Sequence, residues 1–210
     1  DNLFLDTVLD NKRGYCLSLS VLYLAMGERL GLPLYGVVVP SHFFVRYDDG
    51  RVRFNIEATS KGGYADDKHY IDKFKIPSGN SGIYLQNLDK RQTLGCFFNN
   101  LGNSYSNAGN TKMALVAFET AVEINPLLPE SRTNLGNIYA ACERNADAVA
   151  SYRRALVLTP ESPDVHYNFG ALCEKLKMYA EAGIAYQTAI RLRQDHGPAR
   201  WKLAHVHRYL

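Results

Sequence analysis

The sequence contains few cysteines and lacks any long apolar run. Four cysteines occur among its 210 residues, and none forms a Cys-x-x-Cys pair or a paired Cys/His spacing of the kind that binds zinc. No apolar run approaches the roughly 20 residues that a membrane-spanning helix requires. The first ten residues, DNLFLDTVLD, are acidic and lack the pattern of a signal peptide. We therefore expect neither a zinc site nor a membrane span.

The chain begins with Asp1 rather than with methionine, which indicates a fragment or a processed form. The missing signal pattern favours a cytoplasmic location and leaves a periplasmic one open if an upstream signal has been removed. An even number of cysteines permits two disulfides. A chain of this length builds a core without them, so we expect mostly reduced thiols.

An excess of charge of one sign is also missing. The chain has 24 Lys and Arg against 21 Asp and Glu, a net charge of +3. The basic residues are dispersed, and no basic stripe alternates with aromatic residues, so we expect no nucleic-acid partner. No motif implies a metal or an organic cofactor, and we expect none.

A 34-residue period runs through the second part of the sequence. Residues of one kind return in register: Leu101-Gly102, Leu135-Gly136 and Phe169-Gly170; Ala114, Ala148 and Ala182; Phe118, Tyr152 and Tyr186. The pattern resembles the tetratricopeptide repeat, a pair of helices with small residues where they cross. The resemblance implies full repeats at 95–128, 129–162 and 163–196, a partial repeat at 197–210, and an all-α solenoid with a concave face.

Asparagine recurs at the sixth position of each repeat, as Asn100, Asn134 and Asn168. In this repeat class the first helix lines the concave groove, and a ladder of amide side chains can bond to the backbone of an extended peptide. The ladder is similar to that of O-linked N-acetylglucosamine transferases. We therefore predict a protein or an extended peptide as partner; the alternative is that asparagine merely tolerates a half-exposed helix site.

Residues 1–90 have a different pattern. Positions 14–31 have helical apolar spacing that ends at Gly31-Leu32-Pro33, and apolar runs at 34–39, 43–48 and 51–57 predict short strands. A loop should follow over 60–70, with a short helix at 66–75, and another helix should start near Leu88. We expect an α+β domain at 1–90, the repeats at 91–210, and a boundary near 85–94.

The dipeptide Asp49-Gly50 predicts a tight two-residue turn between the second and third strands. Asp48 then pairs with Arg51, and His42 lies directly opposite Glu57, close enough for a carboxylate to orient an imidazole. Asn55 shares that face, diagonal to His42, and is an alternative orienting group. A three-residue loop would shift the register by one. Glu57 can also form an ordinary ion pair with Arg46 or Arg53.

Cys16 stands at the start of the first helix, where free N–H groups and the helix dipole lower a thiol pKa. Alone it could be a buried core cysteine, the role we expect for Cys96, Cys142 and Cys173. With His42 as base and Glu57 as orienting group, however, it forms a nucleophilic constellation of Cys, His and acid.

The stretches NKRGYCLSLSVLYLAMGERLGLPLYGVVVPSHFFVRY and RFNIEAT resemble the transglutaminase-like superfamily, which has a papain-like fold, and look most like its bacterial branch with following repeats. The resemblance implies a cysteine-dependent acyl-transfer enzyme, a peptidase, amidase or transamidase. It implies Cys16 as nucleophile, His42 as base and Glu57 as orienting acid, where the family usually has Asp, with Thr59 matching a family Thr.

The same resemblance implies a polar residue upstream of the cysteine in the oxyanion hole, for which Asn11 is the nearest candidate; the backbone N–H of Cys16 is a second donor. The alternative function is a catalytically inactive domain of this type within a peptide-binding scaffold.

Overall fold

The computed structural model describes residues 15–60, 62–76 and 82–209, and the chain divides into two compact units. The first unit runs to Leu101 and includes Glu123–Asn125. The second comprises Gly102–Val122 and Pro126–Leu210. The first holds helices and a four-stranded antiparallel sheet, and the second consists of helices. The predicted order of an α+β core followed by an all-α solenoid is confirmed.

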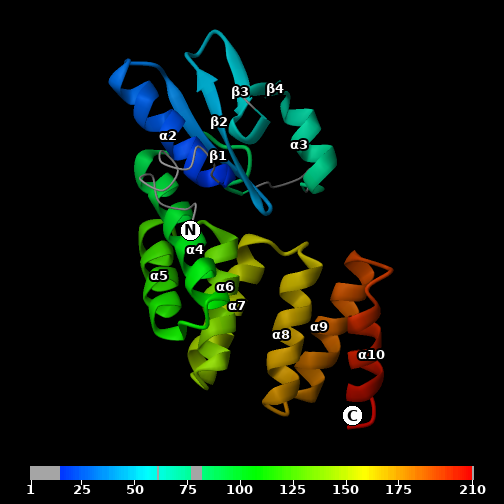
Figure 1. The fold of residues 1–210 in the computed structure, drawn as a ribbon. Helices are drawn as coiled ribbons and strands as arrows, with labels where there is room; N and C mark the ends of the chain where they lie inside the picture. Colours follow the sequence, from blue (N-terminus) through cyan, green and yellow to red (C-terminus); the bar gives the residue numbers. More distant parts are fainter. Residues whose placement is uncertain (1–14, 61, 77–81, 210) are drawn as a thin grey trace. The chain divides into compact units, whose positions relative to one another are not determined.

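The sheet of the first unit is a meander whose strands lie in chain order. Helix α2 (Cys16–Arg29) packs against the first two strands, and Figure 1 shows α2 and α3 (Asp67–Phe74) on opposite sides of the sheet. Fully buried apolar side chains such as Leu17, Phe44 and Tyr70 form the core. The strands are β1 (Leu34–Val39), β2 (His42–Asp48), β3 (Arg53–Glu57) and β4 (Gly63–Ala65), and a short 3₁₀ helix η1 (Ala58–Ser60) follows β3.

A two-residue turn joins β1 to β2 and fixes where β2 begins. Val39 pairs with His42, which leaves Pro40 and Ser41 as the turn. Proline suits the first turn position, and Ser41 takes a φ of 60° in the left-handed region, as the second position of such a turn requires. His42 is therefore the first residue of its strand.

The predicted two-residue turn between β2 and β3 is wrong. Asp48 pairs with Arg53, so the loop has four residues, and the Asp49 carboxylate accepts from the N–H groups of Arg51 and Val52 at 2.8 and 2.7 Å. These bonds make a wider loop than a tight Asp-Gly turn. The register consequently moves by two residues, and Asn55 pairs with Arg46.

An even shift keeps every side chain on its predicted face, because side chains alternate between faces with a period of two. His42 and Glu57 therefore still share a face, as diagonal neighbours rather than directly opposed residues.

Two other segments show how local chemistry sets element bounds. Residues 63–65, expected in a loop, form β4 along the free edge of β3, where Ile56 pairs with Tyr64. The helix expected at 66–75 is confirmed as α3, and its start is capped by the Asp66 side chain, which accepts from the N–H of His69. The helix expected near Leu88 begins at Lys90.

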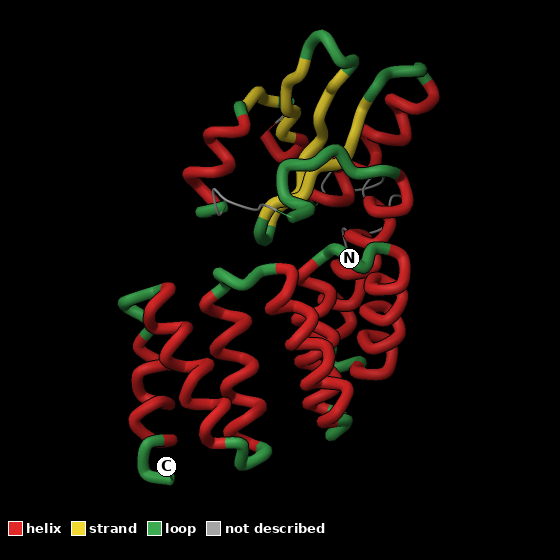
Figure 2. Tube along the Cα trace, turned by 180° about the vertical axis from the view of Figure 1, so that it is seen from behind, coloured by secondary structure: helices red, strands yellow, loops and turns green. Residues whose placement is uncertain are grey.

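The second unit consists of helices that repeat in register (Figure 2). Each repeat places a glycine on its first helix against an aromatic ring of its second: Gly102 with Phe118, Gly136 with Tyr152, and Gly170 with Tyr186. The recurring alanines are fully buried. The helices are α4 (Lys90–Asn107), which starts in the first unit, α5 (Thr111–Ile124), α6 (Pro129–Ala141), α7 (Asn145–Leu158), α8 (Pro163–Lys175), α9 (Tyr179–Leu192) and α10 (Gly197–Val206).

We predict that Gly102→Ala destabilises the repeats by about 1–3 kcal/mol, because the new Cβ would lie 2.6 Å from ring atoms of the buried Phe118. The control is Gly197→Ala, whose Cβ would meet nothing within 4 Å. Chemical denaturation followed by circular dichroism measures both. Equal midpoints for the two variants would contradict this packing.

Candidate active site

Cys16 is the first residue of α2, the position predicted from the sequence, and its side chain is half-buried. Its sulfur accepts from the backbone N–H groups of Phe43 and Leu17 and is hydrogen-bonded to the His42 side chain. Burial raises the pKa of the Cys16 thiol. His42, through its hydrogen bond and charge, and the two N–H groups together outweigh burial and bring that pKa below its ordinary value.

His42 lies between the thiol and an acid. Its Nε2 is 2.8 Å from Oε2 of Glu57, and each of the two side chains is 15% exposed. With Nε2 engaged, Nδ1 is the ring nitrogen left for Cys16. Burial lowers the pKa of His42, but its bonds to Cys16 and Glu57 raise the net pKa above the ordinary value. The imidazole is thus held between two groups that favour its protonated form.

Glu57 stays ionised beside this imidazole. Burial raises the pKa of its carboxyl, but His42 and the hydroxyls of Thr59 and Tyr70 lower it, and the net pKa is below normal. Thr59 donates to Oε1 at 3.0 Å and Tyr70 to Oε2 at 3.1 Å. A thiolate, an imidazolium and a carboxylate in this order can attack a carbonyl carbon and pass a proton to a leaving group.

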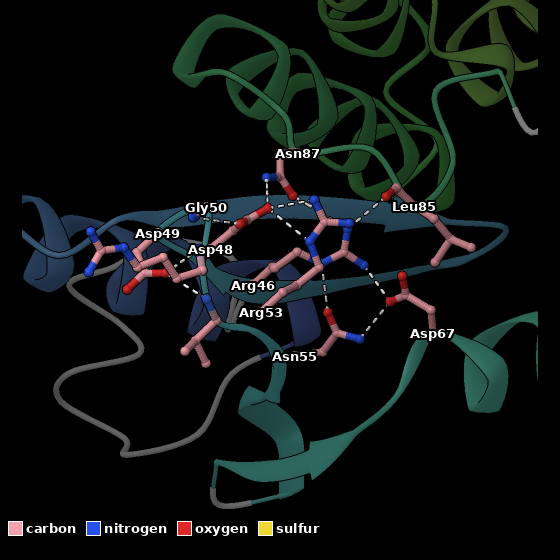
Figure 3. Close-up of polar contacts among 11 residues, drawn as sticks. Arg46, Asp48, Asp49, Gly50, Arg53, Asn55, Asp67, Leu85 and Asn87 are labelled. Atoms are coloured by element: carbon pink, nitrogen blue, oxygen red, sulfur yellow. Dashed lines mark hydrogen bonds and ion pairs between the residues drawn. The ribbon is translucent and has the colours of Figure 1, made fainter.

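Asn55 is not placed to orient His42. Its Oδ1 accepts from Nε of Arg46 and its Nδ2 donates to Asp67, both at 2.8 Å (Figure 3). The same contacts exclude the alternative in which Arg46 or Arg53 pairs with Glu57, because Arg46 pairs with Asp67 and Arg53 with Asp48.

The other cysteines differ from Cys16. All four are free, and Cys96 and Cys173 are buried, as expected. The core role expected for Cys142 is wrong, because this residue lies at the exposed C-terminal cap of α6. Burial first, and then the Glu181 carboxylate, raises the pKa of Cys173 to about 11. Asn11, the predicted oxyanion donor, lies outside the described residues. Within 15–60, 62–76 and 82–209, no group of three or more His, Cys, Asp and Glu is placed to hold a metal ion.

The asparagines at the sixth repeat position lie on the first helices of the repeats, α4, α6 and α8, and all three are half-buried. Nδ2 of Asn134 donates to Oδ1 of Asn103, which belongs to the preceding repeat, at 3.0 Å. Side-chain amides of neighbouring repeats therefore come within hydrogen-bonding distance of each other.

Sequence reasoning missed Tyr70 and Phe74, both on α3. The Phe74 ring lies parallel to the His42 imidazole, with centroids 5.3 Å apart and planes at 7°. The two aromatic residues are four positions apart and so share one face of the helix. Their spacing in the sequence indicates a shared aromatic face on a helix, but nothing in the sequence indicates which side of the sheet that helix covers.

Family models match both parts of the chain. Residues 1–95 match the model described as transglutaminase-like superfamily. Residues 136–177 match a TPR repeat, and residues 97–126 and 163–196 match a tetratricopeptide repeat.

Curated relatives match only a short segment. The F-box only protein 21 of Mus musculus and that of Homo sapiens are each 43% identical to this chain over 49 residues, 23% of this chain. The matched segment covers 8% of their length, so the chain spans a small part of them. The expected likeness to the bacterial branch of the transglutaminase-like superfamily stays a prediction.

Solved structures show the repeat fold. The first TPR domain of Spaghetti (RPAP3), bound to the HSP90 peptide SRMEEVD, aligns with 58% of this chain and 95% of its own at 20% identity and a TM-score of 0.54. An O-GlcNAc transferase of Thermobaculum terrenum aligns with 59% of this chain and 24% of its own, again at 20% identity and 0.54. In the part of the chain that the structure describes, no helix is long and apolar enough to cross a membrane.

We predict that Cys16 reacts with iodoacetamide with a pH midpoint below the ordinary thiol pKa of about 8.5. His42→Ala should move the midpoint upward by about one unit or more, because burial raises the pKa of the thiol and the lowering effect of His42 is then lost. Mass spectrometry of the Cys16 peptide at timed intervals gives the rates. Cys142→Ala is the control and should leave the profile unchanged. The same midpoint with and without His42 would show that the two side chains are not coupled.

Proposed function

Because this chain carries a transglutaminase-like core domain followed by tetratricopeptide repeats, we propose that it is a cysteine-dependent acyl-transfer enzyme whose repeats recruit a protein or peptide substrate. The observation that carries the proposal is the alignment of Cys16, His42 and Glu57, with the thiol hydrogen-bonded to the imidazole and the imidazole 2.8 Å from the carboxylate. A lowered thiol pKa and a raised histidine pKa favour a thiolate beside an imidazolium, which is the charge state that such chemistry needs.

In the proposed reaction the Cys16 thiolate attacks the carbonyl carbon of an amide and forms a C–S bond. The His42 imidazolium then gives its proton to the amine, and the C–N bond breaks. Water attacks the resulting thioester while His42 takes the water's proton. The C–S bond breaks, and the thiolate and imidazolium are restored. An amine in place of water would make the same site a transamidase.

Glu57 and the backbone support these steps. Glu57 keeps Nε2 of His42 engaged, so that Nδ1 faces the sulfur, and its charge stabilises the imidazolium. Cys16 is the first residue of α2, and the first N–H groups of a helix have no acceptor within the helix. We propose the N–H of Cys16 as a donor to the oxyanion.

The repeats have the proposed role of holding an extended peptide through Asn100, Asn134 and Asn168. An amide side chain offers both a donor and an acceptor, the combination that a peptide backbone needs. The support for this role is that asparagine recurs at the same position of the first helix in all three repeats. A similar repeat domain, that of Spaghetti, is named as bound to an HSP90 peptide.

We predict that Cys16→Ala lowers hydrolysis of a peptide library by at least about 10³-fold and Glu57→Gln by about 10²- to 10⁴-fold, since each removes a group that acts on the reacting atoms or on His42. Cys142→Ala, at an exposed thiol, serves as control. Product mass spectrometry provides the rates. Hydrolysis that survives Cys16→Ala would contradict the enzyme proposal, and an unaltered chain that cleaves nothing would favour the inactive scaffold.

Replacing Asn100, Asn134 and Asn168 together with alanine should weaken capture of an extended peptide by about tenfold or more, because several hydrogen bonds are lost. Cys16→Ala should leave capture intact. Fluorescence anisotropy with a labelled peptide measures both, after circular dichroism has established that the variants fold. Equal affinity in the triple variant would exclude the asparagine ladder as the binding element.

A further inference from the structure

The Glu57 carboxylate receives three side-chain donors. His42 and Tyr70 both bond to Oε2, at 2.8 and 3.1 Å, and Thr59 bonds to Oε1 at 3.0 Å. A glutamate has several rotatable bonds between its backbone and its carboxylate, so a single partner would leave it many positions. Because donors bond to both of its oxygens, the carboxylate is held in a single position.

Tyr70 is the donor whose position is most tightly fixed. It is 0% exposed, and its ring stacks on Phe44 with centroids 3.9 Å apart and planes at 10°. Burial, then the neighbouring Glu57 charge, raises the pKa of Tyr70 well above its usual range. The hydroxyl therefore stays protonated at neutral pH and serves as a donor to the Glu57 carboxylate.

The helix that carries Tyr70 is itself anchored to the sheet. Asp67, the first residue of α3, accepts from the guanidinium of Arg46 at 2.5 Å and from Asn55 at 2.8 Å. Arg46 is 1% exposed and also donates to the carbonyl of Leu85 at 2.7 Å, as Figure 3 shows. A buried guanidinium with this many partners fixes the helix start in one place.

One face of α3 thus makes three successive contacts with the sheet. Asp67, Tyr70 and Phe74 are spaced by three and four residues, which places them in a row along the helix. The first meets Arg46, the second meets Glu57, and the third stacks on His42. Anchoring at Asp67 therefore determines how the other two side chains meet the candidate active site.

We propose that Tyr70 is a positioning residue: α3, anchored at Asp67 by Arg46, holds the Tyr70 hydroxyl on Glu57 and thereby keeps the carboxylate on His42. The proposal deepens the proposed function and rests on it, because it assigns to Glu57 the task of orienting His42. Tyr70 itself touches neither the thiol nor a substrate in this account.

The test is the pKa of His42, read from the ring C–H signals of the full chain by NMR. His42 faces Cys16 from α2, Glu57 from β3, and the uncharged rings of Tyr70 and Phe74 from α3. Tyr70→Phe keeps the ring on Phe44 and removes only the hydroxyl. We expect it to lower the pKa of His42 by about half a unit to one unit, because a less constrained carboxylate stabilises the imidazolium less.

A double-mutant cycle shows whether Tyr70 acts through Glu57. In a Glu57→Gln background, Tyr70→Phe should change the pKa of His42 no further. Tyr64→Phe, at an exposed tyrosine of β4, is the control and should have no effect in either background. A chain that hydrolyses nothing can still show these shifts, whereas an active enzyme without them would refute the positioning role alone.

Three results would overturn the proposal. One is an unchanged or raised pKa of His42 in Tyr70→Phe, since a rise would mean that the hydroxyl competes with His42 for Oε2. Another is an equal fall in the Glu57→Gln background. The third is a Tyr70→Phe variant that does not fold, which would show that the hydroxyl serves the core rather than the site.

Discussion

The candidate active site depends on one histidine whose two sides are both occupied. His42 bonds to Glu57 through Nε2 and to the thiol of Cys16 on its other side. It can do so because a two-residue turn places it first in β2, because the sheet register brings Glu57 to the same face, and because α2 begins with the cysteine. Charge then stabilises charge: each group holds its neighbour in the ionised form against the cost of burial.

Elements set by periodic patterns were predictable from the sequence. The 34-residue period gave the repeats because glycine, alanine and aromatic positions return wherever helices pack, and the glycines do lie against the aromatic rings. The core strands followed from apolar runs, and α2 from a helical pattern that ends at a stop signal. Even with the wrong loop length, His42 and Glu57 were placed on one face because strand side chains alternate with a period of two.

Features that depend on side chains meeting across the fold were not predictable. The four-residue loop arises because Asp49 bonds to two backbone N–H groups, a choice that the dipeptide Asp49-Gly50 does not reveal. The sequence allowed Asn55 as an orienting group for His42, but in the structure both ends of its amide are hydrogen-bonded to Arg46 and Asp67. The contact of Tyr70 with Glu57 could not be predicted, because it depends on how α3 packs on Phe44.

The most direct test of the account is whether Cys16 and His42 each shift the pKa of the other. His42→Ala should raise the Cys16 pKa and Cys16→Ala should lower the His42 pKa, because each substitution removes the group that stabilises the charged form of the other. Thiolate absorbance of a chain that keeps Cys16 as its single cysteine gives the first, and NMR titration of His42 gives the second. A rise in the Cys16 pKa and a fall in the His42 pKa are predicted. A His42 pKa that Cys16→Ala leaves unchanged would contradict the coupling on which the site is built.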